Sequence, residues 1–190
     1  MSLRAKDTKE EILIIGKQLI QLVGYNAFSY ADISKKLNIK NAAVHYHYPG
    51  KQDLLLSLLT NYISQYKNLG TELETSSLHS LKKLEKFIDP YTQLVDNNSI
   101  CIIGSIASDY NTLPNAVKIK IAELIDLVIG LVEQTLRTGK KAGELNFTIP
   151  ARTQALLIMT NLAAGVQLAR ITGKQDFVAI KKSILQHLKT

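Results

Sequence analysis

The side chains best suited to chemistry on a partner molecule lie in one short stretch, residues 41–51, which reads Asn-Ala-Ala-Val-His-Tyr-His-Tyr-Pro-Gly-Lys. The amide of Asn41 can bond the edge of a base, and the methyl groups of Ala42 and Ala43 can contact a thymine methyl. Imidazole, phenol and ammonium groups can donate hydrogen bonds to phosphate oxygens. This combination favours recognition of double-stranded DNA, without any bond being made or broken.

The residues that would donate to phosphate lie next to the residues that would read bases. Tyr46 and His47 come later in the same predicted helix, and Lys51 opens the next one, where a helix N-terminus itself favours anions. We predict the DNA contacts to be Ser29, Lys40, Asn41, Ala42, Ala43, His45, Tyr46, His47 and Lys51.

A metal site and a catalytic nucleophile are the competing interpretations of these side chains. His45 and His47 are two residues apart, so on a helix their rings point about 200° apart and cannot easily share one ion. Cys101, the one cysteine of the chain, has no accompanying His or Asp motif, and a buried cysteine is usually inert. The sequence has no HExxH, GxSxG or phosphate-binding glycine loop. We therefore expect no metal, no cofactor and no enzymatic activity.

Helices must position these side chains, because the chain shows helical rather than strand-like periodicity throughout. Glycine and proline are sparse, at 10 and 4 residues, and they separate about nine helical segments. Thr8 is predicted to begin the first helix, Gly139 to follow the seventh, and Pro90 to kink or split the fifth. The predicted helices cover residues 8–23, 30–37, 41–47, 51–69, 77–96, 100–110, 115–138, 150–171 and 177–188. The predicted fold class is all-α.

A four-residue turn, residues 37–40, joins the second and third predicted helices, which is the turn length of a helix-turn-helix. Asn38 suits a position with positive φ, where asparagine is tolerated almost as well as glycine. Ser29 is predicted to cap the second helix, with Asp32 at its third position. Val44 is predicted to pack the third helix against the others. The remaining side chains of the third helix would then face outward.

Composition and charge permit a nucleic-acid partner without requiring one. The net charge is +7 and the pI is about 9.4, which suits a polyanion. Apolar residues make up 46% and charged residues 21%, as in ordinary globular proteins. No stretch approaches the ~18 consecutive apolar residues of a membrane span, and the first residues are too polar for a secretory signal. We expect a cytoplasmic protein with no membrane partner.

Around the helix-turn-helix, the sequence resembles the tetracycline-repressor (TetR) family of bacterial transcriptional regulators. The residues that match the family pattern are Ile12, Leu13, Leu19, Gly24, Tyr25, Ser29, Asp32, Ile33, Ile39, Val44, Tyr46, His47, Tyr48, Pro49, Lys51 and Leu54. The departures are Gly16 and Ser34 for Ala, Asn38 for Gly, His45 for the first Tyr and Tyr48 for Phe. The resemblance implies that Tyr48 belongs to the core and that the position of His45 contacts phosphate.

The resemblance and a change of composition near Leu54 divide the chain into two predicted domains. Residues 1–53 form the DNA-binding domain, and residues 54–190 form a ligand-binding and dimerisation domain. Aromatic and sulfur-containing side chains on the later helices could line an apolar effector site, although each one singly is more typical of ordinary core. These candidates are Tyr62, Tyr66, Phe87, Tyr91, Cys101, Tyr110 and Met159.

The last two predicted helices carry more apolar surface than one core requires, which favours a homodimer built through a four-helix bundle. Packing within one chain is the alternative. The predicted subunit contacts are Leu162, Gly165, Val166, Ala169, Phe177, Ile180, Ile184 and Leu188. A dimer also suits the DNA partner, because two helix-turn-helix units about one DNA turn apart read a palindrome.

These features predict a homodimeric regulator, most simply a repressor, that binds a palindromic operator and is released by a small, largely apolar effector. Activation is the alternative within this class. A DNA-independent carrier of hydrophobic ligands is the alternative from another class, and its affinity for polyanions would never become sequence-specific. An enzyme built on a helical bundle is the third interpretation, and nothing in the sequence predicts its reaction.

Overall fold

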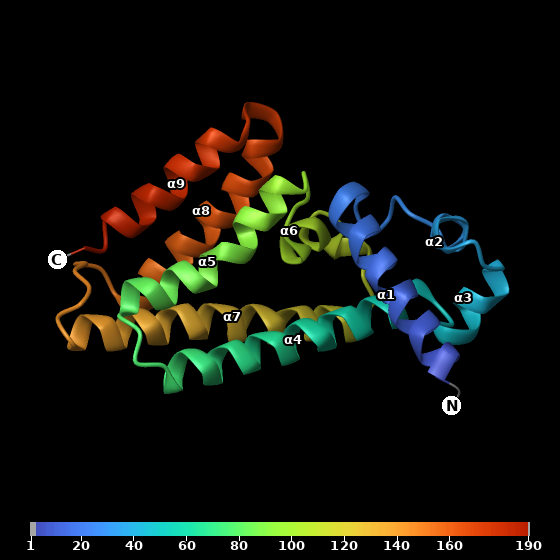
Figure 1. Ribbon diagram of the computed structural model, residues 1–190, viewed down its shortest axis with the longest axis horizontal. Helices are drawn as coiled ribbons and strands as arrows, with labels where there is room; N and C mark the ends of the chain where they lie inside the picture. The colour runs from blue at the N-terminus through green and yellow to red at the C-terminus, as the bar shows by residue number, and fades with distance from the viewer. Residues whose placement is uncertain (1–2, 190) are drawn as a thin grey trace. The chain divides into compact units, whose positions relative to one another are not determined.

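In the computed structural model, the backbone is described for residues 3–189 and the side chains for residues 7–189. Over this range the chain forms nine α-helices and a 3-10 turn, η1, without any strand (Figure 1). The elements are α1 (Leu3–Val23), α2 (Tyr30–Leu37), α3 (Asn41–His47), α4 (Lys51–Thr75), α5 (Ser80–Asp96), α6 (Ile102–Ala107), η1 (Tyr110–Thr112), α7 (Asn115–Lys141), α8 (Ala151–Thr172) and α9 (Lys174–Gln186). The predicted all-α fold is confirmed.

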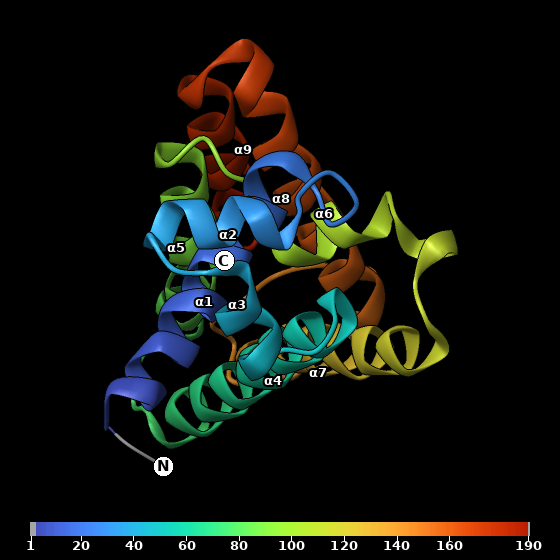
Figure 2. The ribbon, with the colours of Figure 1, turned by 90° about the vertical axis from the view of Figure 1, so that its right-hand side faces the viewer.

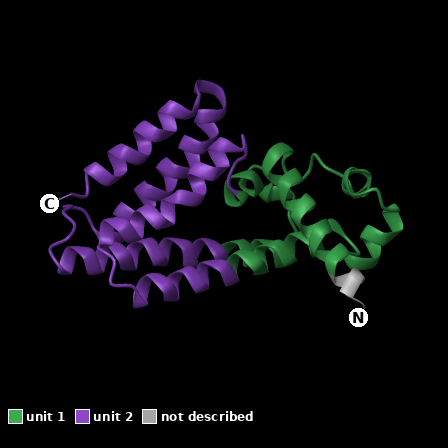
Figure 3. Cartoon of the chain, viewed as in Figure 1, with its two compact units in different colours: residues 1–63, 102–123 green, residues 64–101, 124–190 purple. Residues whose placement is uncertain are grey.

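The chain divides into two compact units (Figure 3). Unit 1 comprises residues 1–63 and 102–123, and unit 2 comprises residues 64–101 and 124–190. Unit 1 therefore holds α1, α2 and α3 together with α6 and η1, while α4 and α7 contribute residues to both units. The functional boundary predicted after residue 53 lies within α4 and stays a prediction.

The core of unit 1 is built from the apolar faces of α1 to α3 and the start of α4. The side chains of Ile12, Ile33, Val44 and Leu54 are 0% exposed, and α1, α2 and α3 lie together in both views (Figure 1 and Figure 2). Gly16 lets α1 approach α4, because a Cβ added there would lie 2.8 Å from Leu54 Cδ2. This core holds α3 against α1 and α2 and fixes which side of α3 faces outward.

The core of unit 2 is formed by α5, α8 and α9 together with part of α7. The helices α8 and α9 run side by side in both views (Figure 1 and Figure 2), with Phe177 of α9 fully buried. Gly139 of α7 lies at a close approach, since an added Cβ would lie 2.6 Å from both Ser80 Cβ and Leu145 Cδ1. The glycine therefore serves packing between elements rather than the end of a helix.

Several predicted helix ends are wrong. The helix α1 begins at Leu3 rather than at Thr8, α4 continues through Gly70 to Thr75, and α7 continues through Gly139. A glycine inside a helix costs only about 1 kcal/mol relative to alanine, which the packing of a long helix readily offsets. Pro90 does not split α5, which is one continuous helix with this proline exposed.

By length and composition alone, one helix of the described residues, α8, could cross a membrane. About a third of its most apolar window, 33%, is buried within the chain. The buried residues of α8 face the other helices of unit 2, and the core helix of a soluble protein has the same composition. This observation is weak evidence for a membrane span.

Candidate nucleic-acid interface

The start of α2 is held by the local hydrogen bonds predicted from the sequence. The Asp32 carboxylate accepts from the Ser29 backbone N–H at 2.7 Å and from its hydroxyl at 2.8 Å. These two bonds hold the pKa of Asp32 below its ordinary value. Ser29 is exposed and precedes the first turn of α2 as its N-cap, so the predicted helix start is confirmed.

The turn between α2 and α3 has the geometry that its sequence predicts. Asn38 adopts φ 53° and ψ 45°, in the left-handed region. Its backbone N–H donates to the carbonyls of Lys35 and Ser34 and so ends α2. Lys40 follows with extended backbone angles and forms the N-cap of α3. The turn therefore sets the direction in which α3 leaves α2.

One side of α3 is buried and the other faces outward. Val44 is 0% exposed, whereas Asn41, Ala42 and Tyr46 are exposed, Tyr46 by 80%. His45 and Lys40 are also exposed, and Ala43 and His47 are half-buried. Tyr48 is only 3% exposed, which confirms that it belongs to the core. The structure thus leaves Asn41, Ala42, His45 and Tyr46 exposed on one side of α3, whereas Ala43 and His47 are partly covered.

Lys51 is the exception, because its ammonium group points into unit 1. It donates to the carbonyls of Tyr25 at 2.6 Å and Phe28 at 2.7 Å, and it lies 4.8 and 4.3 Å from the centroids of their rings. Two of its three N–H donors are therefore used within the chain. Burial lowers the pKa of Lys51, while the carboxylates of Asp109 and Asp32 act in the opposite direction. Lys51 therefore holds the turn between α1 and α2 against α4.

The imidazole of His45 is fixed by two neighbours. Its Nδ1 lies 3.2 Å from the Pro49 carbonyl oxygen, and its ring stacks edge-on against Tyr30 with centroids 4.8 Å apart. His47 pairs edge-on with Tyr46 instead, at 5.1 Å. No group of three metal-ligating side chains lies together among the described residues.

A further contact within unit 1, which the sequence did not predict, joins the α1–α2 turn to η1. The backbone N–H of Asn26 donates to Asp109 Oδ2, and its side-chain amide donates to Asp109 Oδ1 and Thr112 Oγ1, each at 3.0 Å. The Ser105 hydroxyl of α6 also donates to the Ile20 carbonyl of α1. These residues are far apart in the sequence and belong to no local motif, so no sequence signal could have paired them.

Of the predicted effector-binding residues, the structure brings four together in unit 2. The rings of Tyr66 and Phe87 have centroids 6.2 Å apart, and those of Phe87 and Tyr91 6.1 Å apart. Burial, followed by the charge of the nearby Cys101, raises the pKa of Tyr66 to about 12. We call Tyr66, Phe87, Tyr91 and Cys101 the aromatic cluster.

The other three candidates lie outside the aromatic cluster. Tyr62 and Tyr110 belong to unit 1, where the ammonium groups of Lys17 and Lys118 lie over their rings at 5.3 and 5.2 Å. Met159 is half-buried on α8.

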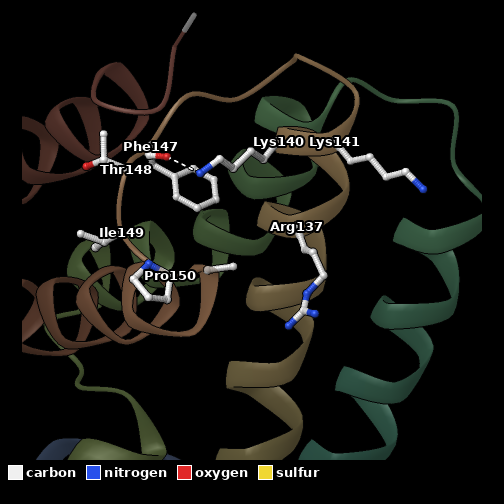
Figure 4. Close-up of a pocket in the computed structure, with 8 residues that line it drawn as sticks. Arg137, Lys140, Lys141, Phe147, Thr148, Ile149 and Pro150 are labelled. Atoms are coloured by element: carbon white, nitrogen blue, oxygen red, sulfur yellow. Dashed lines mark hydrogen bonds between the residues drawn. The ribbon is translucent and has the colours of Figure 1, made fainter.

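Unit 2 also has a cavity of about 520 Å³ where α7 leads into α8 (Figure 4). Its basic side chains are partly engaged within the chain: Lys140 donates to the Phe147 carbonyl at 2.6 Å and lies 4.6 Å from its ring centroid, and Arg137 pairs with Glu133. The lining residues are Arg137, Lys140, Lys141, Phe147, Thr148, Ile149, Pro150 and Ala151. The cavity shares no residue with the aromatic cluster, and the sequence did not predict it.

Most of the predicted subunit contacts are buried within the chain. Leu162, Val166, Phe177 and Leu188 are 0% exposed, and Ala169 is 7% exposed; Gly165 is also buried, with α9 directly over it. These six side chains pack mainly within the core of one chain, and the predicted subunit contacts stay a prediction. Ile180 and Ile184 keep partial exposure. The physical reason is that the apolar stripe of α9 packs on α8 and α5 of the same chain.

The outward face of α8 carries exposed apolar residues in place of those predicted. Leu157 is 47% exposed, Leu168 46% and Ile171 86%, and Ala164 is also exposed. At 100° per residue these four positions fall on one face of the helix, opposite the buried face. We call them the outer α8 face.

A helix-turn-helix that presents a polar and basic face, joined to a helical body with an apolar cluster, defines a DNA-binding regulator of transcription. Residues 12–58 match the model of bacterial regulatory proteins of the tetR family, and residues 80–182 match the tetracyclin repressor-like C-terminal domain. The chain belongs to the TetR family. It is a transcriptional regulator with a helix-turn-helix and a ligand-binding C-terminal domain.

Three relatives illustrate the similarity. A TetR-family regulator from Agrobacterium tumefaciens has 28% identity and a TM-score of 0.90, covering 98% of this chain and 100% of the other. A fatty acid metabolism regulator protein of Bacillus subtilis is 20% identical over 180 residues, 94% of this chain and 92% of the relative. The regulator FadR from Bacillus subtilis, solved in complex with stearoyl-CoA, has 18% identity and a TM-score of 0.69, covering 93% and 95%. The last two similarities establish the fold alone.

Proposed function

We propose that this protein is a cytoplasmic repressor that binds a palindromic operator as a homodimer and leaves it when a small, largely apolar effector enters unit 2. The observation that carries the proposal is the outward face of α3, where Asn41, Ala42 and Tyr46 are exposed while Val44 anchors the helix. A helix supported in this way can enter the major groove. Family members are generally not enzymes, and the proposal assigns this chain no reaction.

The proposed division of labour on α3 can be tested with a site selected from random duplex DNA. Tyr46→Phe removes only a hydroxyl, so we expect roughly tenfold weaker binding to all sequences alike. The salt dependence should stay the same, because a neutral hydroxyl releases no counterion. Tyr110→Phe is the matched control, because Tyr110 is also an exposed tyrosine of unit 1. Equal affinities of the Tyr46→Phe variant and the wild type would remove this hydroxyl from the interface.

The same experiment also tests whether Asn41 reads bases. Repeating the selection with Asn41→Ala is expected to return a changed consensus, because a lost amide contact relaxes discrimination at one base position. If both proteins select the same site, Asn41 does not read bases. If the wild type enriches no sequence at all while retaining affinity for polyanions, the alternative of a DNA-independent ligand carrier is favoured.

For the dimer, we propose that the outer α8 face replaces the buried residues predicted from the sequence. Leu157, Leu168 and Ile171 expose apolar side chains in one row, and the small Ala164 between them allows close approach of a second helix. The same face on a partner related by a two-fold axis would meet it, as in a self-complementary interface. We call the helix-turn-helix of each subunit its DNA-binding head. The two heads of one dimer would then read the two halves of a palindrome.

For the effector, we propose a ligand with a long apolar chain that reaches the aromatic cluster. The cluster joins the buried rings of Phe87 and Tyr91 to Tyr66, and a distant relative of the same fold binds stearoyl-CoA. The ligand would act only through a different affinity for the DNA-bound and free conformations.

Stearoyl-CoA is expected to release the protein from its selected DNA site, measured by fluorescence anisotropy, whereas coenzyme A alone is not. The difference isolates the acyl chain, which is the part that an apolar cluster can bind. Release by coenzyme A alone would place recognition on the nucleotide instead. If neither compound changes the affinity for DNA, the long-chain thioester is not the effector.

A further inference from the structure

The hydrogen bond from His45 to Pro49 decides which nitrogen of the imidazole carries the proton. A carbonyl oxygen only accepts hydrogen bonds, so the 3.2 Å contact between Nδ1 and the Pro49 oxygen requires a proton on Nδ1. Neutral imidazole has one N–H group and one lone pair. The neutral ring of His45 therefore presents the lone pair of Nε2, an acceptor, as its remaining polar atom.

This arrangement is unsuitable for a phosphate as long as His45 is neutral. Phosphate oxygens are acceptors too, so Nε2 of the neutral ring offers them no donor. The other neutral tautomer would break the bond to Pro49. A protonated ring keeps the bond to Pro49 and gains an N–H at Nε2, which adds a charge-assisted hydrogen bond to phosphate. The tyrosine that the family usually carries at this position needs no such proton.

Titratable groups also lie on the neighbouring elements. From α2, Tyr30 faces the ring, and burial raises the pKa of this phenol well above its ordinary value, so it stays neutral. The α1 ammonium of Lys9 lies over the ring of Tyr48, and the α4 ammonium of Lys51 lies over Tyr25 and Phe28.

The remaining titratable groups near His45 are on the start of α4 and on α3 itself. The Asp53 carboxylate accepts from the Gly50 N–H at 2.8 Å, where it closes the first turn of α4. On α3, Tyr46 and His47 pair with one another. His47 is itself a predicted phosphate contact, so the exposed His79 of unit 2 provides the control.

We propose that His45 couples DNA binding to proton uptake, with the protonated ring donating through Nε2 to a DNA phosphate while Nδ1 stays bonded to Pro49. This inference rests on the proposed function, because it assigns a regulation to the same face of α3. Imidazole side chains titrate between about pH 5 and 8. Since the bound state holds more protons than the free state, affinity for DNA rises as the pH falls.

The test measures the affinity of the full chain for a fluorescein-labelled 30-base-pair duplex of fixed sequence from pH 8.5 to pH 5.5 at constant ionic strength. A phosphate contact is independent of sequence, so an arbitrary duplex suffices. For the wild type, we expect the affinity for DNA to rise by roughly tenfold per head as the pH falls from 8.5 to 5.5. The salt dependence at pH 5.5 should be steeper than at pH 8.5 by about 0.9 per head.

Three variants separate His45 from the other imidazoles. His45→Gln is expected to have a much flatter pH profile, because its amide donors do not titrate, and His79→Gln, an exposed histidine of unit 2, to keep the wild-type profile. His45→Tyr restores a neutral donor and should bind well with the same flat profile. His45 is exposed, and circular dichroism of each variant checks that the fold is retained.

The outcomes distinguish this inference from the proposed function. A His45→Gln variant that keeps the full pH dependence of the wild type, or a wild-type affinity that does not change with pH, overturns the coupling and leaves DNA binding intact. A wild type that binds no duplex at any pH overturns the proposed function together with it.

Discussion

Leu168→Glu is expected to give a monomer that binds the selected operator at least about 100-fold more weakly than the wild type. Leu168 lies in the middle of the outer α8 face and is 46% exposed, so its replacement leaves the core of the chain untouched. In the proposed dimer, a carboxylate there would face its own symmetry mate, and burying two like charges without partners is costly. Once the dimer is lost, the second head no longer binds at high effective concentration, which is worth a factor of about 10² to 10⁴.

The measurement combines analytical ultracentrifugation for the assembly state with anisotropy for DNA affinity. Leu78→Glu is the matched control, because Leu78 is a leucine of unit 2 with 44% exposure that lies before α5 and is not part of the outer α8 face. The control should remain dimeric and bind normally. A dimeric Leu168→Glu variant with unchanged affinity would contradict the proposed interface, and a monomeric wild type would contradict the homodimer itself.

Lys51→Met is expected to lower the free energy of unfolding of unit 1 by about 3 kcal/mol. The substitution keeps an apolar side chain of similar length but removes the ammonium that donates to the carbonyls of Tyr25 and Phe28. Hydrogen bonds to a charged group are worth about 1.5–3 kcal/mol, and the lost contacts over the two rings add about 0.5–1 kcal/mol. The two carbonyls would also be left without this partner.

Denaturant unfolding followed by circular dichroism measures the decrease in the free energy of unfolding. Faster hydrogen exchange of the amides in residues 24–28 would show that the α1–α2 turn is destabilised. Lys36→Met is the control, since Lys36 is an exposed lysine of α2 and its loss changes the net charge equally. Exposed substitutions of this kind usually change stability by less than about 0.5 kcal/mol. If Lys51→Met unfolds like the wild type but binds DNA with a shallower salt dependence, the main role of Lys51 is to bind a DNA phosphate.

Local structure in the DNA-binding head could be predicted from the sequence because it depends on neighbouring residues. The cap formed by Ser29 and Asp32 acts over three positions, and the left-handed turn at Asn38 follows from the one residue type there that tolerates it. The burial of Val44 follows from apolar spacing on a short helix, and the burial of Tyr48 is what the resemblance to the family implies. These features agree with the structure residue by residue.

Features that depend on contacts between distant segments could not be predicted. The apolar stripes of α8 and α9 are equally consistent with a partner chain and with each other, and only the packed chain shows that Phe177 and Leu162 are already buried. Likewise, Lys51 looks like a phosphate ligand in the sequence, because nothing local shows that the carbonyls of residues 25 and 28 lie at its ammonium group. The bonds from Asn26 to Asp109 span 83 residues and have no sequence pattern.

The amino-acid sequence by itself determined that this protein is all-helical and that it has a helix-turn-helix with an outward polar face, because periodicity, caps and turn residues act over a few positions. Tertiary structure alone decided which apolar faces remain exposed for a partner and which nitrogen of His45 is free. Burial and hydrogen-bond direction are properties of groups that only the folded chain brings together.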